Sequence, residues 1–180
     1  LTLDDDSWGW NIGALFNLSP KTKLGISYRS EVEYKTNGKI EITGPAAANS
    51  SDAKADITLP DVFVLSVTHK LSDRIELLGD VARTGWSSIP KVDVIRASAT
   101  LSGLQIGSIA QTLDTDFKDT WRFALGANYK LNDEWMLKGG IAYDQTPVKG
   151  ASTRLVSLPD NDRTWFSVGA QWKPSKTLTL

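Results

Sequence analysis

Apolar and polar residues alternate with a period of two along most of this chain, a pattern that few folds accept. The first clear stretch places apolar side chains at every second position, namely Trp8, Trp10, Ile12, Ala14, Phe16 and Leu18. Only Leu15 interrupts the alternation there. Because successive side chains of a β-strand point to opposite faces, the pattern predicts strands with one apolar and one polar face.

The alternation returns in further stretches, which are separated by connections of two different lengths. These stretches cover residues 23–35, 63–71, 75–84, 121–131, 135–144 and 166–172. Short turns lie near positions 20, 73, 133 and 175, whereas long connections span about 36–60, 96–116 and 146–162. The long connections are rich in small and polar residues, so we expect exposed loops there.

All the short turns fall at one end of the resulting up-and-down meander. Outer-membrane barrels show this asymmetry, because their periplasmic turns are short and their extracellular loops are long. The sequence therefore predicts an all-β fold, an antiparallel up-and-down transmembrane β-barrel. It supplies about seven full strands and the start of another. Residues in the middle of the apolar faces should contact lipid: Ile26, Val67, Leu125 and Ile141.

Aromatic residues cluster at the ends of the expected strands. Near the short turns lie Phe16, Tyr129, Trp135 and Trp172, and near the long loops lie Trp8, Trp10, Tyr34, Trp121 and Tyr143. Trp and Tyr favour the two membrane interfaces, so the pattern predicts two aromatic belts. A soluble antiparallel sandwich, whose buried faces also alternate, remains open as an alternative.

Composition excludes several classes of protein. The 20 Lys and Arg residues balance 21 Asp and Glu residues, so there is no basic footprint for nucleic acid. With one His and no Cys, zinc sites and disulfide scaffolds are not expected. No apolar run reaches the roughly 18 residues of a membrane-spanning helix. The chain begins without Met and stops abruptly at Leu180, so we expect further sequence on both sides.

Three consecutive motifs resemble the FadL family of outer-membrane transporters for long-chain fatty acids and hydrocarbons. They are residues 117–126 (FKDTWRFALG), 142–148 (AYDQTPV) and 158–165 (LPDNDRTW), and their order and spacing match the family. Two shorter motifs, Leu59-Pro60-Asp61 and Thr84-Gly85-Trp86-Ser87, resemble further family segments. The similarity therefore covers essentially the whole chain.

The resemblance implies a fourteen-stranded barrel closed by an N-terminal hatch. Residues 1–180 would form part of that single domain, without the hatch, the early strands and the final closing strands. The implied function is passive uptake of long-chain fatty acids or related hydrophobic compounds across the bacterial outer membrane by a monomer. It implies contact with outer-membrane lipid or detergent, and no catalytic residue, cofactor, metal or nucleic acid.

Two basic residues are candidate ligands for the cargo. Lys118 has the strand parity of Arg122 and lies at the long-loop end, and the resemblance implies a pocket in which basic residues meet the ligand head group. Lys118 is otherwise a solvated strand-end residue. The polar faces carry several further charges, namely Arg29, Glu31, Glu33, Asp80, Lys138 and Asp144. With Arg122, these form either a pathway or a salt-bridged filling.

Three further groups of residues are expected to have structural roles. The cluster Asp160-Asn161-Asp162-Arg163 lacks the ligand spacing and Gly of an EF-hand, so a turn held by Asx hydrogen bonds is expected. An outer-membrane lipid enzyme would require a Ser–His pair at His69, the one His. A soluble β-sheet protein with a binding or structural role is the other rival. Arg83 falls on the apolar face, where a position near the outer interface costs least.

Overall fold

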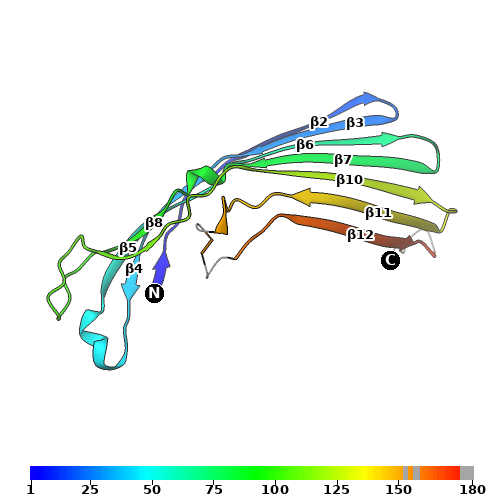
Figure 1. Cartoon of the computed structure of the whole chain (residues 1–180). Helices are drawn as coiled ribbons and strands as arrows, with labels where there is room; N and C mark the ends of the chain where they lie inside the picture. The colour runs from blue at the N-terminus through cyan, green and yellow to red at the C-terminus, as the bar shows by residue number, and fades with distance from the viewer. Residues whose placement is uncertain (152–153, 156–158, 175–180) are drawn as a thin grey trace.

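The computed structural model describes residues 1–151, 154–155 and 159–174 and contains two antiparallel sheets (Figure 1). The seven-stranded sheet has the order β12-β11-β10-β7-β6-β3-β2. Its strands are β2 (Asn11–Ser19), β3 (Thr22–Arg29), β6 (Val62–Lys70), β7 (Ile75–Thr84), β10 (Thr120–Lys130), β11 (Trp135–Asp144) and β12 (Arg163–Trp172). No helix in these ranges is long and apolar enough to cross a membrane.

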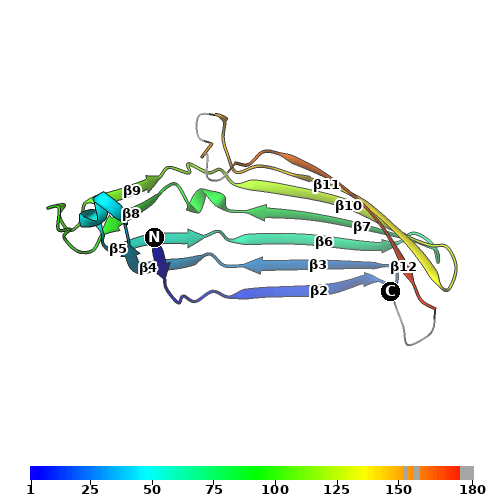
Figure 2. The same cartoon turned by 90° about the horizontal axis from the view of Figure 1, so that it is seen from below.

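A five-stranded sheet continues from one end of the seven-stranded sheet, as Figures 1 and 2 show. Its order is β1-β4-β5-β8-β9. The strands are β1 (Thr2–Asp4), β4 (Val32–Ile40), β5 (Ser51–Leu59), β8 (Val92–Arg96) and β9 (Ile109–Leu113). Two short 3₁₀ helices, η1 (Gly44–Asn49) and η2 (Trp86–Ser88), lie in the connections. This sheet therefore extends the molecule at the end where the long connections gather.

The meander predicted from the alternation is confirmed, and small polar side chains close its short turns. Ser72 Oγ accepts hydrogen bonds from the backbone N–H groups of Arg74 and Ile75. Asn132 Oδ1 accepts from the N–H groups of Glu134 and Trp135, at 2.9 and 2.8 Å. Such side chains replace backbone partners in tight turns, which is why these residues fix the hairpins.

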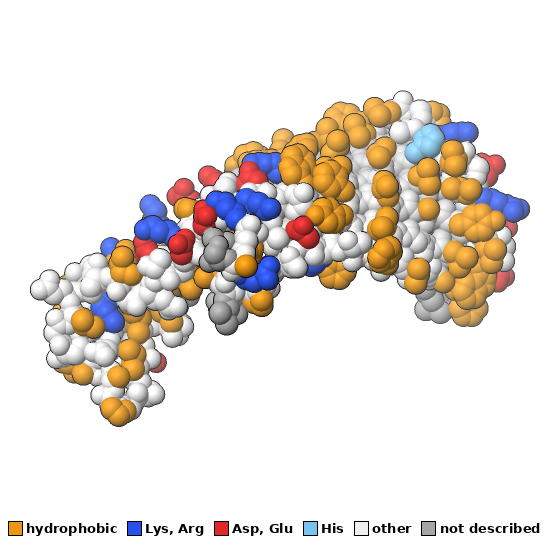
Figure 3. Space-filling view, viewed as in Figure 1, with side chains coloured by type: hydrophobic (Ala, Val, Ile, Leu, Met, Phe, Trp, Pro, Cys, Tyr) orange, Lys and Arg blue, Asp and Glu red, His pale blue; other side chains and the backbone are white. Residues whose placement is uncertain are grey.

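Strand register gives the seven-stranded sheet one apolar and one polar face. One continuous cross-strand row on the apolar face is Phe16, Leu24, Val67, Gly79, Leu125, Ile141 and Phe166. The adjacent row on the polar face is Leu15, Gly25, Ser66, Asp80, Ala124, Ala142 and Trp165. Figure 3 shows apolar side chains gathered over the seven-stranded sheet. Ile26, Val67, Leu125 and Ile141 thus share one face, as predicted.

Aromatic side chains mark both ends of the apolar face. Trp135 and Trp172 stack near the short turns, with ring centroids 5.7 Å apart. Trp10 and Tyr28 pair at the opposite end, at 5.3 Å. Outer-membrane barrels carry such aromatic belts at the two membrane interfaces.

The apolar face is not the core of a soluble sandwich. Leu125 is 68% exposed, Ile141 45% and Val67 39%, and within the described ranges no second layer covers them. The buried hydrophobic cluster lies elsewhere, in the five-stranded sheet, at Ala53, Ala55, Val92 and Val94. An exposed apolar surface of this size marks a face that contacts a membrane or a partner.

The long connections expected at 36–60 and 96–116 do join strands of the seven-stranded sheet, but they are not loops throughout, because both carry strands of the five-stranded sheet. In β5, Ala53 and Ala55 are buried while Asp52, Lys54 and Asp56 are exposed. Burial therefore alternates as in a strand. The sequence did not indicate this, because alanine has a low β-propensity and a segment rich in small residues looks like a loop. The stretch 23–35 is also divided, since β3 ends at Arg29 and β4 begins at Val32. The expected strand start at Leu178 to Leu180 lies outside the described residues.

Candidate functional site

The polar face of the seven-stranded sheet carries cross-strand ion pairs. Arg122 on β10 lies 3.2 Å from Asp80 on β7. Arg163 on β12 lies 3.0 Å from Asp144 on β11. These contacts fit the expected salt-bridged filling for Arg122, Asp80 and Asp144. Since each pair joins two neighbouring strands, it also supports the register of that face.

A hollow of about 470 Å³ lies on the polar face beside Arg122. Its lining includes Asp80, Ala124, Ala142 and Trp165. A guanidinium has five N–H donors in a fixed fork, and the contact to Asp80 occupies part of that capacity. Arg122 therefore retains donors for a carboxylate that enters the hollow.

Lys118 lies two residues before β10, at the long-loop end of the sheet. Its side chain is exposed, and its backbone N–H donates to the carbonyl of Pro147 at 3.0 Å. Within the described part of the chain, the Lys118 ammonium has no hydrogen bond or ion pair. Lys118 and Arg122 have different charged neighbours in the structure. Arg122 pairs with Asp80, whereas the carboxylate that Lys118 influences is that of Asp162. The two cations therefore do not form one site.

Asp162 tethers the connection between β11 and β12. Its carboxylate accepts hydrogen bonds from the Thr146 N–H at 2.8 Å and from the Tyr143 hydroxyl at 2.7 Å. The bond from Thr146, then that from Tyr143, and more weakly the charge of Lys118, hold the pKa of Asp162 below its usual value. Asp160 accepts from the Thr146 hydroxyl at 3.0 Å. The hydrogen bonds accepted by Asp160 and Asp162 thus join the two ends of this connection, and among the described residues they are not the local Asx bonds predicted.

His69 lies on β6, at the end of the apolar face near the short turns. Its Nδ1 shares a hydrogen bond of 2.9 Å with the Thr22 hydroxyl of β3. This contact joins neighbouring strands at their ends and does not form a Ser–His–Asp array.

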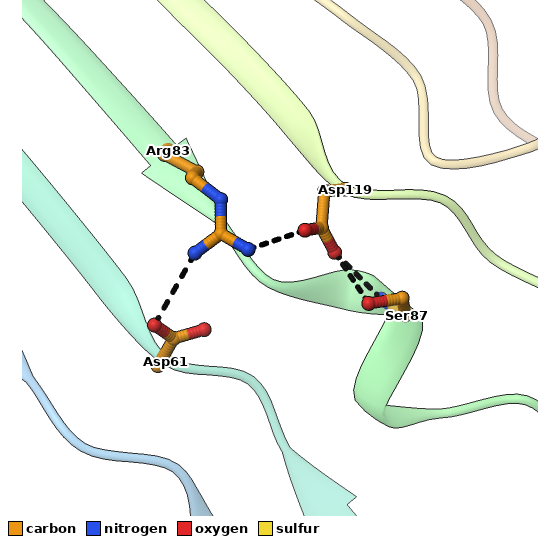
Figure 4. Close-up of polar contacts among 4 residues, drawn as sticks. All are labelled: Asp61, Arg83, Ser87 and Asp119. Atoms are coloured by element: carbon orange, nitrogen blue, oxygen red, sulfur yellow. Dashed lines mark hydrogen bonds and ion pairs between the residues drawn. The ribbon is translucent and has the colours of Figure 1, made fainter.

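Arg83 forms the most connected polar group on the apolar side, a rim clamp made of Asp61, Arg83, Ser87 and Asp119 (Figure 4). The guanidinium pairs with Asp61 at 3.5 Å and with Asp119. Asp119 also accepts from the Ser87 N–H at 3.1 Å and from its hydroxyl at 2.6 Å. The clamp thereby joins three of the segments that connect the two sheets.

The sequence put Arg83 on the apolar face, where a position near the outer interface costs least, but it did not identify the partners of Arg83. Asp61, Ser87 and Asp119 each lie in a motif singled out above, yet only the pairing of β6, β7 and β10 brings them together. The parity of Asp119 and Trp121, which puts both on the face of Arg83, was the available signal.

Acid should weaken the rim clamp. Hydrogen bonds from Ser87, its hydroxyl first, and the charge of Arg83 lower the pKa of Asp119. A lowered folded-state pKa stabilises the fold above the unfolded value of about 4, and this contribution is lost as pH falls through the lowered pKa. In urea unfolding of the full-length barrel, Asp119→Asn should therefore cost stability at about pH 6 and progressively less toward about pH 3. A cost independent of pH would contradict this, and Asp73→Asn in the β6–β7 turn is the control.

Comparisons with known proteins agree with this architecture. A sequence model of the family described as outer membrane protein transport protein (OMPP1/FadL/TodX) matches residues 1–180. Outer membrane protein P1 of Haemophilus influenzae is 30% identical, over 98% of this chain and 37% of that protein. The long-chain fatty acid transport protein of Escherichia coli K12 is 29% identical, over 99% of this chain and 41% of that protein.

A solved structure also matches. The crystal structure of a Pseudomonas aeruginosa FadL homologue aligns with a TM-score of 0.82 at 26% identity, covering 97% of this chain and 42% of that one. The chain therefore spans about two fifths of the length of these relatives.

Proposed function

Because this chain belongs to the outer membrane protein transport family (OMPP1/FadL/TodX), we propose that it forms part of the wall of a barrel for hydrophobic cargo. Long-chain fatty acids or related hydrophobic compounds pass through that barrel across the bacterial outer membrane. Passage is passive and leaves the cargo chemically unchanged. The observation that supports this most directly is the seven-stranded sheet, with its exposed apolar face and charged opposite face.

The complete barrel works as a monomer in lipid or detergent. Residues 1–180 contribute the later strands, and the hatch, the early strands and the closing strands come from the remainder of a longer polypeptide. The two edges of the seven-stranded sheet, β2 and β12, are where neighbouring strands join. Closure is required, because lipid offers no partner to an open sheet edge.

Lys118 and Arg122 bind the head group of the cargo. Lys118 supports this role because its exposed ammonium has no partner that holds it among the described residues, and a fatty-acid carboxylate supplies one. Arg122 borders the hollow farther along β10 and meets the carboxylate after Lys118. The two cations thus act in succession rather than as one site.

Replacing Lys118 tests this proposal. A hydrogen bond to a charged group is worth roughly 1.5 to 3 kcal/mol, so Lys118→Ala in the full-length barrel should weaken fatty-acid binding by about ten- to a hundredfold. The matching fatty alcohol should bind almost unchanged. Binding to the purified protein in detergent is measured for both ligands.

Lys149→Ala is the matched control, because Lys149 lies at the same end of the sheet but already pairs with Asp116 at 2.5 Å. Equal losses for acid and alcohol in Lys118→Ala would show that Lys118 supports the fold. Unchanged binding of both ligands would show a solvated lysine at a strand end.

A further inference from the structure

Six apolar side chains larger than alanine lie on the polar face of the seven-stranded sheet, where a water-filled lumen favours polar residues: Leu15, Val62, Val64, Leu78, Met136 and Trp165. Leu15 on β2 and Trp165 on β12 are 68% and 56% exposed. Leu78 on β7 is half-buried. Leu15 is the residue that interrupts the alternation of its strand, so its side chain shares a face with Gly25 rather than with Phe16. Val62 and Val64 lie toward the long-loop end of this face and Met136 lies toward the short turns, so Leu15, Leu78 and Trp165 are the apolar exceptions at its middle.

Register places them at one height on the wall. Leu15 and Trp165 belong to the same cross-strand row, and Leu78 belongs to the next row. Between Leu15 and Trp165 the first row holds four small residues and one charged residue, namely Gly25, Ser66, Asp80, Ala124 and Ala142. Trp165 pairs with Ala142, which is only 8% exposed. We call Leu15, Leu78 and Trp165 the mid-height belt.

Charged residues border the mid-height belt on both sides. On β11, Asp144 and Lys138 share the polar face and are separated there only by Ala142 and Gly140. At the rise of a strand, the six steps from Lys138 to Asp144 correspond to roughly 20 Å of β11 without a charge on this face. The 470 Å³ hollow lies beside this stretch of β11, and its lining includes Trp165 and Leu78 together with Asp80, which pairs with Arg122. Arg122 borders the same hollow.

We propose that the mid-height belt binds the hydrocarbon portion of the cargo and that Trp165 determines its chain-length preference. The inference rests on the proposed transport function. It gives a binding site to the hydrocarbon chain, the part of the ligand that Lys118 and Arg122 do not bind. An indole offers a large, rigid apolar surface, and the small residues beside it leave room for a chain. The guanidinium of Arg122 at the border suits the carboxylate end of the same molecule.

The test measures binding of saturated fatty acids of increasing length, and of the matching alcohols, to the full-length barrel in detergent. Trp165→Gln should weaken binding of the long chains about tenfold, because part of the indole surface no longer covers hydrocarbon. Acids and alcohols should lose equally, and the loss should shrink as the chain shortens. Lys118→Ala, by contrast, affects acids alone.

Two further variants keep the result interpretable. Leu15→Gln on the opposite strand should weaken long-chain binding in the same direction but less, since it lies at the far side of the belt. Phe166→Leu, the neighbour of Trp165 on the apolar face, should bind like the wild type and controls for disturbance of β12. Folding of every variant is checked by its resistance to unfolding by heat in detergent.

The possible results separate the proposed belt from the proposed transport function. Unchanged long-chain affinity in Trp165→Gln and Leu15→Gln overturns the belt while leaving the proposed transport intact. A loss of thermal resistance with unchanged affinity also overturns it and indicates that another segment of the protein packs on Trp165. A loss confined to acids assigns Trp165 to the head group. A wild-type barrel that binds neither ligand class overturns the proposed function itself.

Discussion

Residues 1–180, produced without further strands, are expected to yield no transporting pore. Within the described residues, β2 and β12 each pair on one side only, so the outer edge of each strand carries free N–H and C=O groups. Each such group costs several kcal/mol in hydrocarbon, about the whole stability of a small domain when a few are summed. The fragment should therefore associate through its edges or aggregate.

Light scattering of the fragment in detergent, together with fatty-acid entry into lipid vesicles, measures this outcome. The full-length barrel under identical conditions is the control, and it should be monomeric and admit the fatty acid. A monomeric fragment that inserts into vesicles and admits fatty acid would show that edge pairing is not what limits it.

Leu125→Arg should destabilise the full-length barrel by roughly 2 to 4 kcal/mol, the cost of a cation near the middle of the lipid-facing surface. Leu125 lies within β10 in the row between Gly79 and Ile141, and it is 68% exposed on the apolar face. At that position a guanidinium has no water and, among the described residues, no neighbouring carboxylate on its face.

The matched change is Ala124→Arg, one residue away on the polar face. Ala124 pairs with Asp80 across to β7 and borders the hollow, so an arginine there finds space and a carboxylate. Its cost should be well below that of Leu125→Arg when both variants are unfolded by urea from lipid vesicles. Equal costs for the two variants would refute the assignment of faces.

The parts of the fold that the sequence predicted well are those set by local pattern. Strands β6, β7, β10 and β11 follow from alternation alone, and the turns between them follow from residues such as Ser72 and Asn132, whose side chains bond to the adjacent backbone. The direction of each face follows too, because a shift of one residue would expose every charged side chain to lipid.

Features that depend on contacts between distant segments could not be predicted from the sequence. Ala53 and Ala55 lie on β5 between β4 and β8, and they are buried in one cluster with Val92 and Val94 of the β8 strand, some forty residues later. The partners of Arg83 lie 22 and 36 residues away from it, so only register could find them. The sequence shows that Leu15 interrupts the alternation of its strand. Only the register of the folded sheet shows that Leu15 shares a row with Trp165 at the opposite edge. For Lys118 and Arg122, the structure gives positions and neighbours, and their role in binding stays a prediction.

The rim clamp limits how proteins of this kind can recombine. Its arginine belongs to a barrel strand, whereas Asp61, Ser87 and Asp119 stand where the outer segments leave or rejoin the sheet. A single crossover between two parental genes anywhere from residue 84 to residue 118 would leave Arg83 facing an Asp119 that comes from the other parent. Exchange of an internal segment that lies wholly within residues 89–114 keeps all four groups from one parent, so this part of the five-stranded sheet exchanges more safely than its border with the barrel.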